Sequence, residues 1–282
     1  MRIALFADIH GNLVSMEAVL DDIRKSDVDQ IVFLGDTATF GPYPHDVIRR
    51  LRQLDYPCVL GNHDQFLIDP ESMPSLNWVP SWYREQVTKR DIEYLKTFKP
   101  SIEIQLDADN TLLCYHGSPR SNTENIFPLT PPEELDEMIG YRKTTVLAGA
   151  HTHLQMLRQE KGMTIVNSGS VGQPFEEVPY PPKPGPRRFL PWAEYAIINW
   201  TNGRLNVELR HVPVNVKLIK HAIRKSRMPN ADYWESAWML PEEQGHILMR
   251  NGEQQNNTEA PMHAAFAKGA DYVLKSITFG DY

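Results

Sequence analysis

The chain has 282 residues, which is enough for one large domain or for a domain with an appendage. With 41% hydrophobic and 23% charged residues, its composition is that of a soluble globular protein. The formal net charge of -7 argues against nucleic acid as an obligate partner, because binding to the phosphate backbone needs a positively charged surface.

The sequence gives no sign of export or of a membrane anchor. An apolar strand pattern begins at Arg2 in place of a charged segment followed by a long apolar one, so no secretory signal is expected. No run of eighteen uncharged apolar residues occurs, which argues against a membrane span. Cys58 and Cys114 lie in apolar stretches and are expected to be buried free thiols. We therefore expect a cytoplasmic protein.

The first part of the chain alternates strand-like and helix-like patterns. Apolar runs predict strands at 2–7, 30–35 and 57–61, and helical spacing of apolar residues predicts helices at 12–26 and 45–54. This order is typical of a layered α/β fold with a largely parallel core sheet.

The rest of the chain is richer in strands. A helix is predicted at 88–98, where Thr88 and Asp91 form a capping box. Strands are predicted at 101–106, 111–117, 144–150, 164–170, 194–200 and 205–212. The sequence TNGR at 201–204 predicts a hairpin between the last two, and the proline-rich stretch 174–191 predicts an extended loop. Helical spacing resumes after Pro213.

Acidic, amide and imidazole side chains follow these strands repeatedly. They are Asp8 and His10, Asp36, the stretch Gly61–Asp64, His116, and His151 with His153. One such residue alone is usually a helix cap or a hydrogen-bonded structural histidine. Ligands of open α/β sheets bind beyond the carboxyl ends of the strands, so five such sites in one chain predict a common pocket.

This combination of side chains is suited to metal ions. Imidazole and carboxylate without thiolate favour Mn²⁺, Fe, Zn²⁺ or Ni²⁺, with Mn²⁺ as the first choice, whereas structural zinc sites are rich in sulfur. The ligands are too many for one ion. Two divalent ions about 3.5–4 Å apart, bridged by a carboxylate, stabilise both the attacking and the leaving oxygen when a phosphoryl group is displaced.

Taken in order, these residues resemble the signature of the calcineurin-like metallophosphoesterases, D-x-H, G-D, G-N-H-[DE], H and G-H-x-H. Here the signature reads DIH, GD, GNHD, YHG and AHTH between Asp8 and His153. The stretches GDTATFGPYPHDVI and NSGSVGQP resemble the compact bacterial and archaeal branch of that family. The resemblance implies a four-layer α-β-β-α sandwich of two mixed sheets. We expect this domain at 1–212 and a helical C-terminal extension at 213–282, acting as a cap or as an interface.

The resemblance also implies roles for individual residues. One metal would be held by Asp8, His10, Asp36 and His153, and the other by Asp36, Asn62, His116 and His151. His63 would contact the phosphoryl oxygens or protonate the leaving oxygen, with Asp64 orienting it. Ala150 replaces the usual glycine of the last block, which adds a methyl group beside a ligand.

The function implied is hydrolysis of phosphodiester or nucleotide-type phosphoanhydride bonds by a metal-bridging hydroxide. The substrate would be a small phosphorylated or nucleotide compound, with diadenosine tetraphosphate as one candidate. A non-catalytic binding scaffold is the alternative, but scaffold relatives lose ligands that this chain retains. The oligomeric state is left open.

Three further features have two interpretations each. Asn12 is either a helix cap or a phosphate ligand, and Arg187 and Arg188 are either solvated or bound to substrate phosphate. The aromatic stretches NWVPSWY (77–83) and DYWESAW (232–238) are interpreted as helical core, with base stacking as the alternative.

Overall fold

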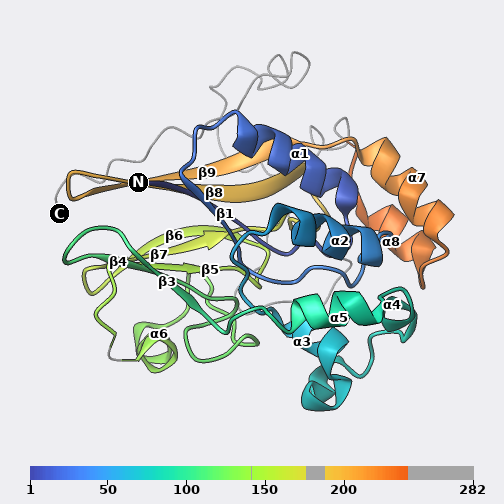
Figure 1. The fold of residues 1–282 in the computed structure, drawn as a ribbon, viewed down its shortest axis with the longest axis horizontal. Helices are drawn as coiled ribbons and strands as arrows, with labels where there is room; N and C mark the ends of the chain where they lie inside the picture. The colour runs from blue at the N-terminus through green and yellow to red at the C-terminus, as the bar shows by residue number, and fades with distance from the viewer. Residues whose placement is uncertain (141, 176–187, 241–282) are drawn as a thin grey trace, which may run out of the picture.

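Two mixed β-sheets lie face to face in the computed structural model, which describes residues 1–140, 142–175 and 188–240 (Figure 1). The first sheet has the strand order β2-β1-β8-β9, and the second has the order β3-β4-β5-β7-β6. The strands are β1 (Arg2–Phe6), β2 (Gln30–Phe33), β3 (Ile102–Gln105), β4 (Thr111–Cys114), β5 (Val146–Gly149), β6 (Gln155–Glu160), β7 (Met163–Ser168), β8 (Trp192–Thr201) and β9 (Arg204–Pro213).

Helices cover the outer faces of both sheets. They are α1 (Leu13–Arg24), α2 (Pro44–Leu54), α3 (Asn62–Ile68), α4 (Trp82–Glu85), α5 (Lys89–Leu95), α6 (Pro132–Ile139), α7 (Val216–Ser226) and α8 (Ala231–Ala237), with the short 3-10 helices η1 (Pro70–Ser72) and η2 (Pro74–Leu76). In Figure 1, α1 lies over the first sheet, and α6 lies below the second.

The alternation of side chains along the strands divides the core into layers. In β1, Ile3 and Leu5 face the apolar layer between the sheets, whereas Ala4 and Phe6 face the layer under α1 and α2. In β4, Leu112 faces the layer between the sheets and Leu113 faces α6. These three apolar layers separate four layers of secondary structure, which confirms the predicted sandwich of two mixed sheets.

Several predictions for single elements need correction. The expected largely parallel core is wrong, because pairings such as β1–β8 and β8–β9 are antiparallel, although β1–β2, β4–β5 and β5–β7 are parallel. The strand predicted at 57–61 forms isolated bridges in place of a ladder. Strand β6 and helix α6 were not predicted. The hairpin at 201–204 is confirmed, since Asn202 and Gly203 both have positive φ between β8 and β9.

The chain after β9 begins with α7 and α8, which pack against each other and against the first sheet's outer layer. Residues 241–282 lie outside the described residues, so the division at Pro213 stays a prediction. Within the part of the chain that the structure describes, no helix is long and apolar enough to cross a membrane.

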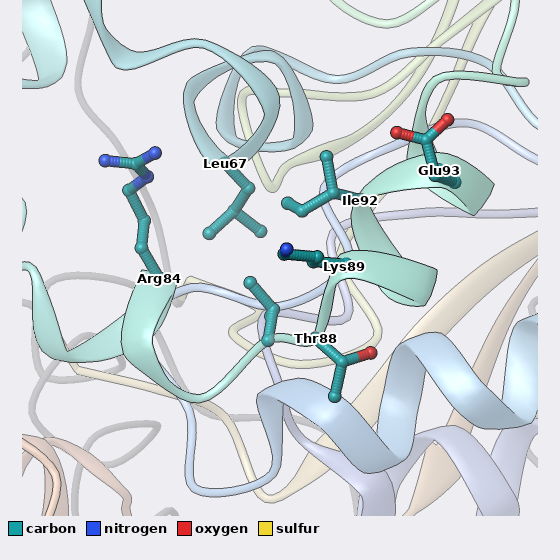
Figure 2. Close-up of a pocket in the computed structure, with 7 residues that line it drawn as sticks. Leu67, Arg84, Thr88, Lys89, Ile92 and Glu93 are labelled. Atoms are coloured by element: carbon teal, nitrogen blue, oxygen red, sulfur yellow. The ribbon is translucent and has the colours of Figure 1, made fainter.

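A cavity of about 360 Å³ lies among α3, α4 and α5 (Figure 2). Its lining combines apolar side chains with a hydroxyl group and charged groups of both signs, and it consists of Leu67, Arg84, Val87, Thr88, Lys89, Ile92 and Glu93. None of the strand-end aspartates and histidines lines it, so this cavity is separate from the predicted metal pocket.

Candidate metal centre

The strand-end side chains meet at one edge of the two sheets. Because β1 and β2 are parallel, and β4 and β5 are parallel, the carboxyl ends of each pair point the same way. Two groups of potential ligands result, each with its ligand atoms within 4.8 Å of one another: Asp8, His10 and His153 in one group, and Asp36, His116 and His151 in the other. All six are buried except His151, which is half-buried.

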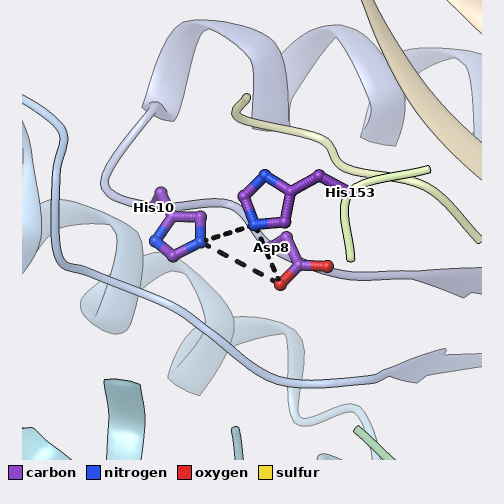
Figure 3. Close-up of side chains that lie close together, drawn as sticks. All are labelled: Asp8, His10 and His153. Carbon is purple, nitrogen blue, oxygen red and sulfur yellow. Dashed lines mark hydrogen bonds and ion pairs between the residues drawn. The ribbon is translucent and has the colours of Figure 1, made fainter. Parts of the chain in front are cut away.

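The first group brings three ligand atoms to one point (Figure 3). The Nε2 atoms of His10 and His153 are 3.0 Å apart. The Oδ1 atom of Asp8 lies 3.9 Å from Nε2 of His10 and 3.5 Å from Nε2 of His153. Both rings therefore direct the same nitrogen toward one carboxylate oxygen.

Asp36 belongs to the second group and also approaches His10 of the first group. The Oδ2 atom of Asp36 is 3.4 Å from Nε2 of His116 and 3.7 Å from Nε2 of His10. Asn62, in the first turn of α3, has its Oδ1 3.0 Å from Nε2 of His116. The carboxylate of Asp36 thus lies between the two groups, as a bridging ligand requires.

Backbone carbonyls orient two of these histidine rings. The Nδ1–H of His116 donates to the carbonyl of Leu34 at 2.8 Å, and the Nδ1–H of His153 donates to the carbonyl of Gln173 at 2.8 Å. A carbonyl only accepts, so each ring carries a proton on Nδ1 and directs Nε2 toward the ligand groups. This pattern is the usual outer support of metal-ligating histidines.

The ligand atoms of the first group are suited to a cation, as the surroundings of Asp8 and His10 show. Among the described residues, Oδ1 of Asp8 is buried and has no hydrogen-bond partner. Burial raises the pKa of Asp8 well above its usual range, although His116 opposes this. Burial and the neighbouring His153 lower the pKa of His10. A divalent ion bound among these groups would favour the charged carboxylate of Asp8 and the neutral imidazole of His10, which are the forms that bind metal.

In the second ligand group, the pKa shifts favour a charged Asp36 carboxylate and a protonated His116. Burial would raise the pKa of Asp36, but His116, His63 and His10 outweigh it and hold that pKa well below its usual range. Burial would lower the pKa of His116, but Asp36 and Asp8 raise it to about 9. Burial and His116 lower the pKa of His151 to about 3. Asp36 therefore concentrates negative charge between the groups.

Five of the candidate ligands have a left-handed backbone. The φ angles are 52° for Asp8, 47° for His10, 65° for Asp36, 69° for His151 and 58° for His153. Such angles are uncommon for residues other than glycine and concentrate at functional sites, where the surrounding structure holds them. Here the turns after β1, β2 and β5 direct each side chain into the pocket.

His63 lies beside the first ligand group, and Asp64 contacts the turn that carries Asp36. His63 is buried, its ring lies 5.2 Å from that of His10, and its Nδ1 has no hydrogen-bond partner in the described part of the chain. Burial lowers the pKa of His63. Asp64 accepts hydrogen bonds from the backbone of Asp36 at 2.8 Å and of Thr37 at 2.9 Å. Asp64 therefore fixes the Asp36 turn, and its role in orienting the His63 ring stays a prediction.

The predicted substrate residues receive less support. Asn12 is the cap of α1, because its Oδ1 accepts from the Ser15 N–H at 3.1 Å. Its Nδ2 donates to the Gly172 carbonyl at 3.1 Å, so the amide is engaged at both ends within the protein. These contacts support the interpretation of Asn12 as a helix cap, and its assignment to substrate stays a prediction. Arg188 is exposed, and Arg187 lies outside the described residues.

Further residues, which were not predicted from the sequence, support the site without belonging to either ligand group. Thr37 donates its hydroxyl to Asp64, and Ser170 donates its hydroxyl to the carbonyl of Asp8 at 2.9 Å. Gln173 binds His153 through its carbonyl. The NSGSVGQP stretch was a signal for the last two, but the sequence alone does not say what these side chains contact.

More than half of the chain matches one family model. The model of the calcineurin-like phosphoesterase superfamily domain matches residues 1–181. A crystal structure of a metallophosphoesterase from Sphaerobacter thermophilus is 26% identical and has a TM-score of 0.64, with 84% of this chain and 98% of that chain covered.

Two sequence relatives extend the comparison. An uncharacterised protein of Methanocaldococcus jannaschii is 25% identical over 235 residues, which are 80% of this chain and 93% of the relative. A symmetrical bis(5'-nucleosyl)-tetraphosphatase of Coxiella burnetii is 21% identical over 220 residues, which are 68% of this chain and 72% of the relative.

Proposed function

Because the chain belongs to the calcineurin-like phosphoesterase superfamily, we propose that it is a hydrolase that uses two divalent metal ions to cleave phosphodiester or nucleotide-type phosphoanhydride bonds. The observation that carries this proposal is the position of Asp36. Its Oδ2 lies 3.7 Å from Nε2 of His10 in one ligand group and 3.4 Å from Nε2 of His116 in the other. A carboxylate so placed suits a bridge between two ions.

Each ion has a full set of ligands in this proposal. The first would be held by Asp8, His10, Asp36 and His153, and the second by Asp36, Asn62, His116 and His151. Bound divalent cations would supply activation of a water molecule and neutralisation of the charge on the phosphoryl group. Mn²⁺ is the proposed metal, with Fe, Zn²⁺ and Ni²⁺ as alternatives.

His63 is the proposed general acid. Its ring is adjacent to the first ligand group, and its Nδ1 is not engaged by the described residues. In this position it can contact a phosphoryl oxygen or give a proton to the leaving oxygen. Asp64 contributes by holding the turn that carries Asp36.

Two considerations favour a nucleotide-type substrate and catalysis. The Coxiella burnetii relative is a dinucleoside tetraphosphatase, so diadenosine tetraphosphate is one candidate for this chain. The alternative of a non-catalytic scaffold would be expected to lack ligands, whereas this chain retains all seven proposed ligands and His63.

The test is metal stoichiometry together with hydrolysis. Protein loaded with Mn²⁺ is expected to bind two ions per chain, measured by elemental analysis, and to release p-nitrophenol from bis-p-nitrophenyl phosphate. Asp36→Asn is expected to weaken both ions and to lower kcat by at least ~100-fold, because both ions lose a ligand.

Asp109→Asn, on an exposed loop, is the matched control and should keep full metal content and rate. A single ion per chain at saturating metal, or an Asp36→Asn variant with two ions and normal turnover, would contradict the proposal.

A further inference from the structure

An exposed tryptophan lies on the outer side of the metal pocket. Trp78 is 67% exposed, although the stretch around it was interpreted as helical core. Its ring is stacked on Phe40, with centroids 5.4 Å apart and an angle of 15° between the planes. The core interpretation holds for the neighbouring Val79 and Tyr83, which are buried, but it is wrong for Trp78.

Phe40 connects this tryptophan to the reaction site. The Phe40 ring lies 4.8 Å from the ring of His63 and 5.7 Å from the ring of His10. Trp78 is therefore one ring away from the proposed general acid and from a proposed metal ligand. Phe40 thus links Trp78 to the site through direct ring contacts on both sides.

The backbone of Phe40 is held in an unusual conformation. Its φ is 65°, which is rare for a bulky residue and has an energetic cost. The side-chain amide of Gln173 donates to the Phe40 carbonyl at 3.1 Å and so secures this turn. The ring that supports Trp78 is thus fixed by the loop that also orients His153.

Other aromatic side chains extend the same surface. Trp234, from α8, is stacked on Phe40 with centroids 5.2 Å apart. Tyr233 packs edge-on against Trp234 at 5.2 Å and is 45% exposed. Exposed aromatic residues gathered from distant parts of the chain mark a binding surface more often than scattered apolar residues do.

We propose that the exposed face of Trp78 stacks on the heterocyclic base of a nucleotide substrate and so determines which phosphoesters the enzyme prefers. This inference rests on the proposed function, since it places the phosphoryl group of the same substrate at the metal pocket. A flat ring with one open face accepts any base, because every base offers a π-face. The preference is therefore for the presence of a base and not for its identity.

The experiment compares two esters that differ only in the base. They are the p-nitrophenyl esters of adenosine 5'-monophosphate and of ribose 5-phosphate, assayed with Mn²⁺-loaded protein. Wild type is expected to prefer the first ester by about 5- to 100-fold in kcat/KM, mainly through a lower KM. Trp78→Ala is expected to lose this preference, and Trp78→Phe is expected to retain most of it.

Leu129→Ala is the matched control, because Leu129 is 72% exposed and lies outside this aromatic surface. It should keep the wild-type preference. A wild type that hydrolyses both esters equally well, or a Trp78→Ala variant with an unchanged preference, would overturn the inference while leaving the proposed function intact. A Trp78→Ala variant that keeps the preference but changes the mass in solution would show instead that Trp78 forms an interface between copies of the chain.

Hydrolysis of neither ester would contradict the proposed function, and binding then tests the tryptophan separately. By calorimetry, Mn²⁺-loaded wild type should bind adenosine 5'-monophosphate more tightly than ribose 5-phosphate, and Trp78→Ala should bind the two with equal affinity. Equal affinities in the wild type would overturn the stacking inference.

Discussion

His63 lies in the first turn of α3 with its ring against both His10 and Phe40. It is close to the proposed ligands without belonging to either ligand group. Its proposed role is to act on the substrate, whereas Asp36 acts through the metals. Variants of His63 should therefore keep their bound metal, whereas variants of Asp36 should lose it.

We predict that His63→Ala lowers kcat by about 10²- to 10⁴-fold while metal content stays at the wild-type value, because general acid catalysis is lost and no ligand is removed. The loss should be larger for esters with a poor leaving group than for p-nitrophenyl esters, since a good leaving group needs less protonation. Steady-state kinetics on a series of esters, with elemental analysis of each sample, measures this.

His221→Ala, on the exposed side of α7, is the control and should behave as wild type. An equal loss for every leaving group would assign His63 to phosphate binding. Loss of metal would instead make it part of the metal site.

At the scale of elements, the turn before α3 approaches the turn after β2 very closely. A Cβ atom on Gly61 would lie 2.1 Å from Oδ1 of Asp36 and 2.4 Å from its backbone nitrogen. We predict that Gly61→Ala displaces the Asp36 carboxylate and weakens metal binding by at least ~10-fold, because a ligand's support is disturbed. Competition with a chromophoric chelator measures the affinity.

Gly162→Ala separates this effect from a general loss of stability. Gly162 has a φ of +81° but open space around its Cβ position, so alanine there is strained without touching the site. It should lower the free energy of unfolding and leave metal affinity unchanged. Equal metal affinities in both variants would refute the close-contact argument.

The elements with strong apolar patterns were predictable, and those that depend on neighbours were not. The helix starting after Thr88 has the expected capping box, with the Asp91 carboxylate accepting from the Thr88 N–H at 2.8 Å. Strand β6 lies at the edge of its sheet and is mostly polar, so its sequence carries little alternation. The apolar run at 57–61 begins with Pro57, which lacks an N–H, and it forms bridges without a ladder.

The candidate site was predictable as a set of residues but not as a set of contacts. Asp8, His10 and their counterparts follow strands directly, and strand direction brings them together. Asp64 contacts Asp36, and Trp78 stacks on Phe40, although each pair is far apart in sequence. Asp36 and Phe40 lie in turns with a left-handed backbone, which the sequence does not clearly indicate. Their roles stay predictions until the variants are measured.

At the scale of the whole molecule, Glu194 lies where the two sheets meet. It belongs to β8 in the first sheet, and its Oε2 occupies the space beside Gly169, which follows β7 in the second. Its Oε1 accepts from the Trp192 indole N–H at 3.1 Å, and Oε2 has no hydrogen-bond partner among the described residues. Burial raises the pKa of Glu194 from 4.5 to about 8.

We predict that this glutamate makes the protein less stable as pH rises. The folded state keeps the proton up to a pH of about 8, whereas the unfolded chain releases it near 4.5, so the folded state binds more protons between these values. Its contribution is fully present below 4.5 and is lost as pH rises through about 8, with a slope of at most ~1.4 kcal/mol per pH unit.

Urea unfolding at pH values from 5 to 8 measures this, with Glu194→Gln as the test and Glu103→Gln, exposed on β3, as the control. The difference in free energy of unfolding between wild type and Glu194→Gln should change with pH, and the difference for Glu103→Gln should stay constant. A pH-independent difference for Glu194→Gln would contradict the prediction.

The position of β1 between β2 and β8 has a consequence for biosynthesis. Residues of β1 pair with Ala196–Asn199 of β8, and the backbone N–H of Gly172 donates to the Asp8 carbonyl at 2.9 Å. The ribosome makes Asp8 and His10 long before it makes β8 and the loop with Gly172, which hold them. The nascent chain therefore cannot complete the pocket until β8 has emerged from the ribosome, so capture of the metals follows the synthesis of this strand.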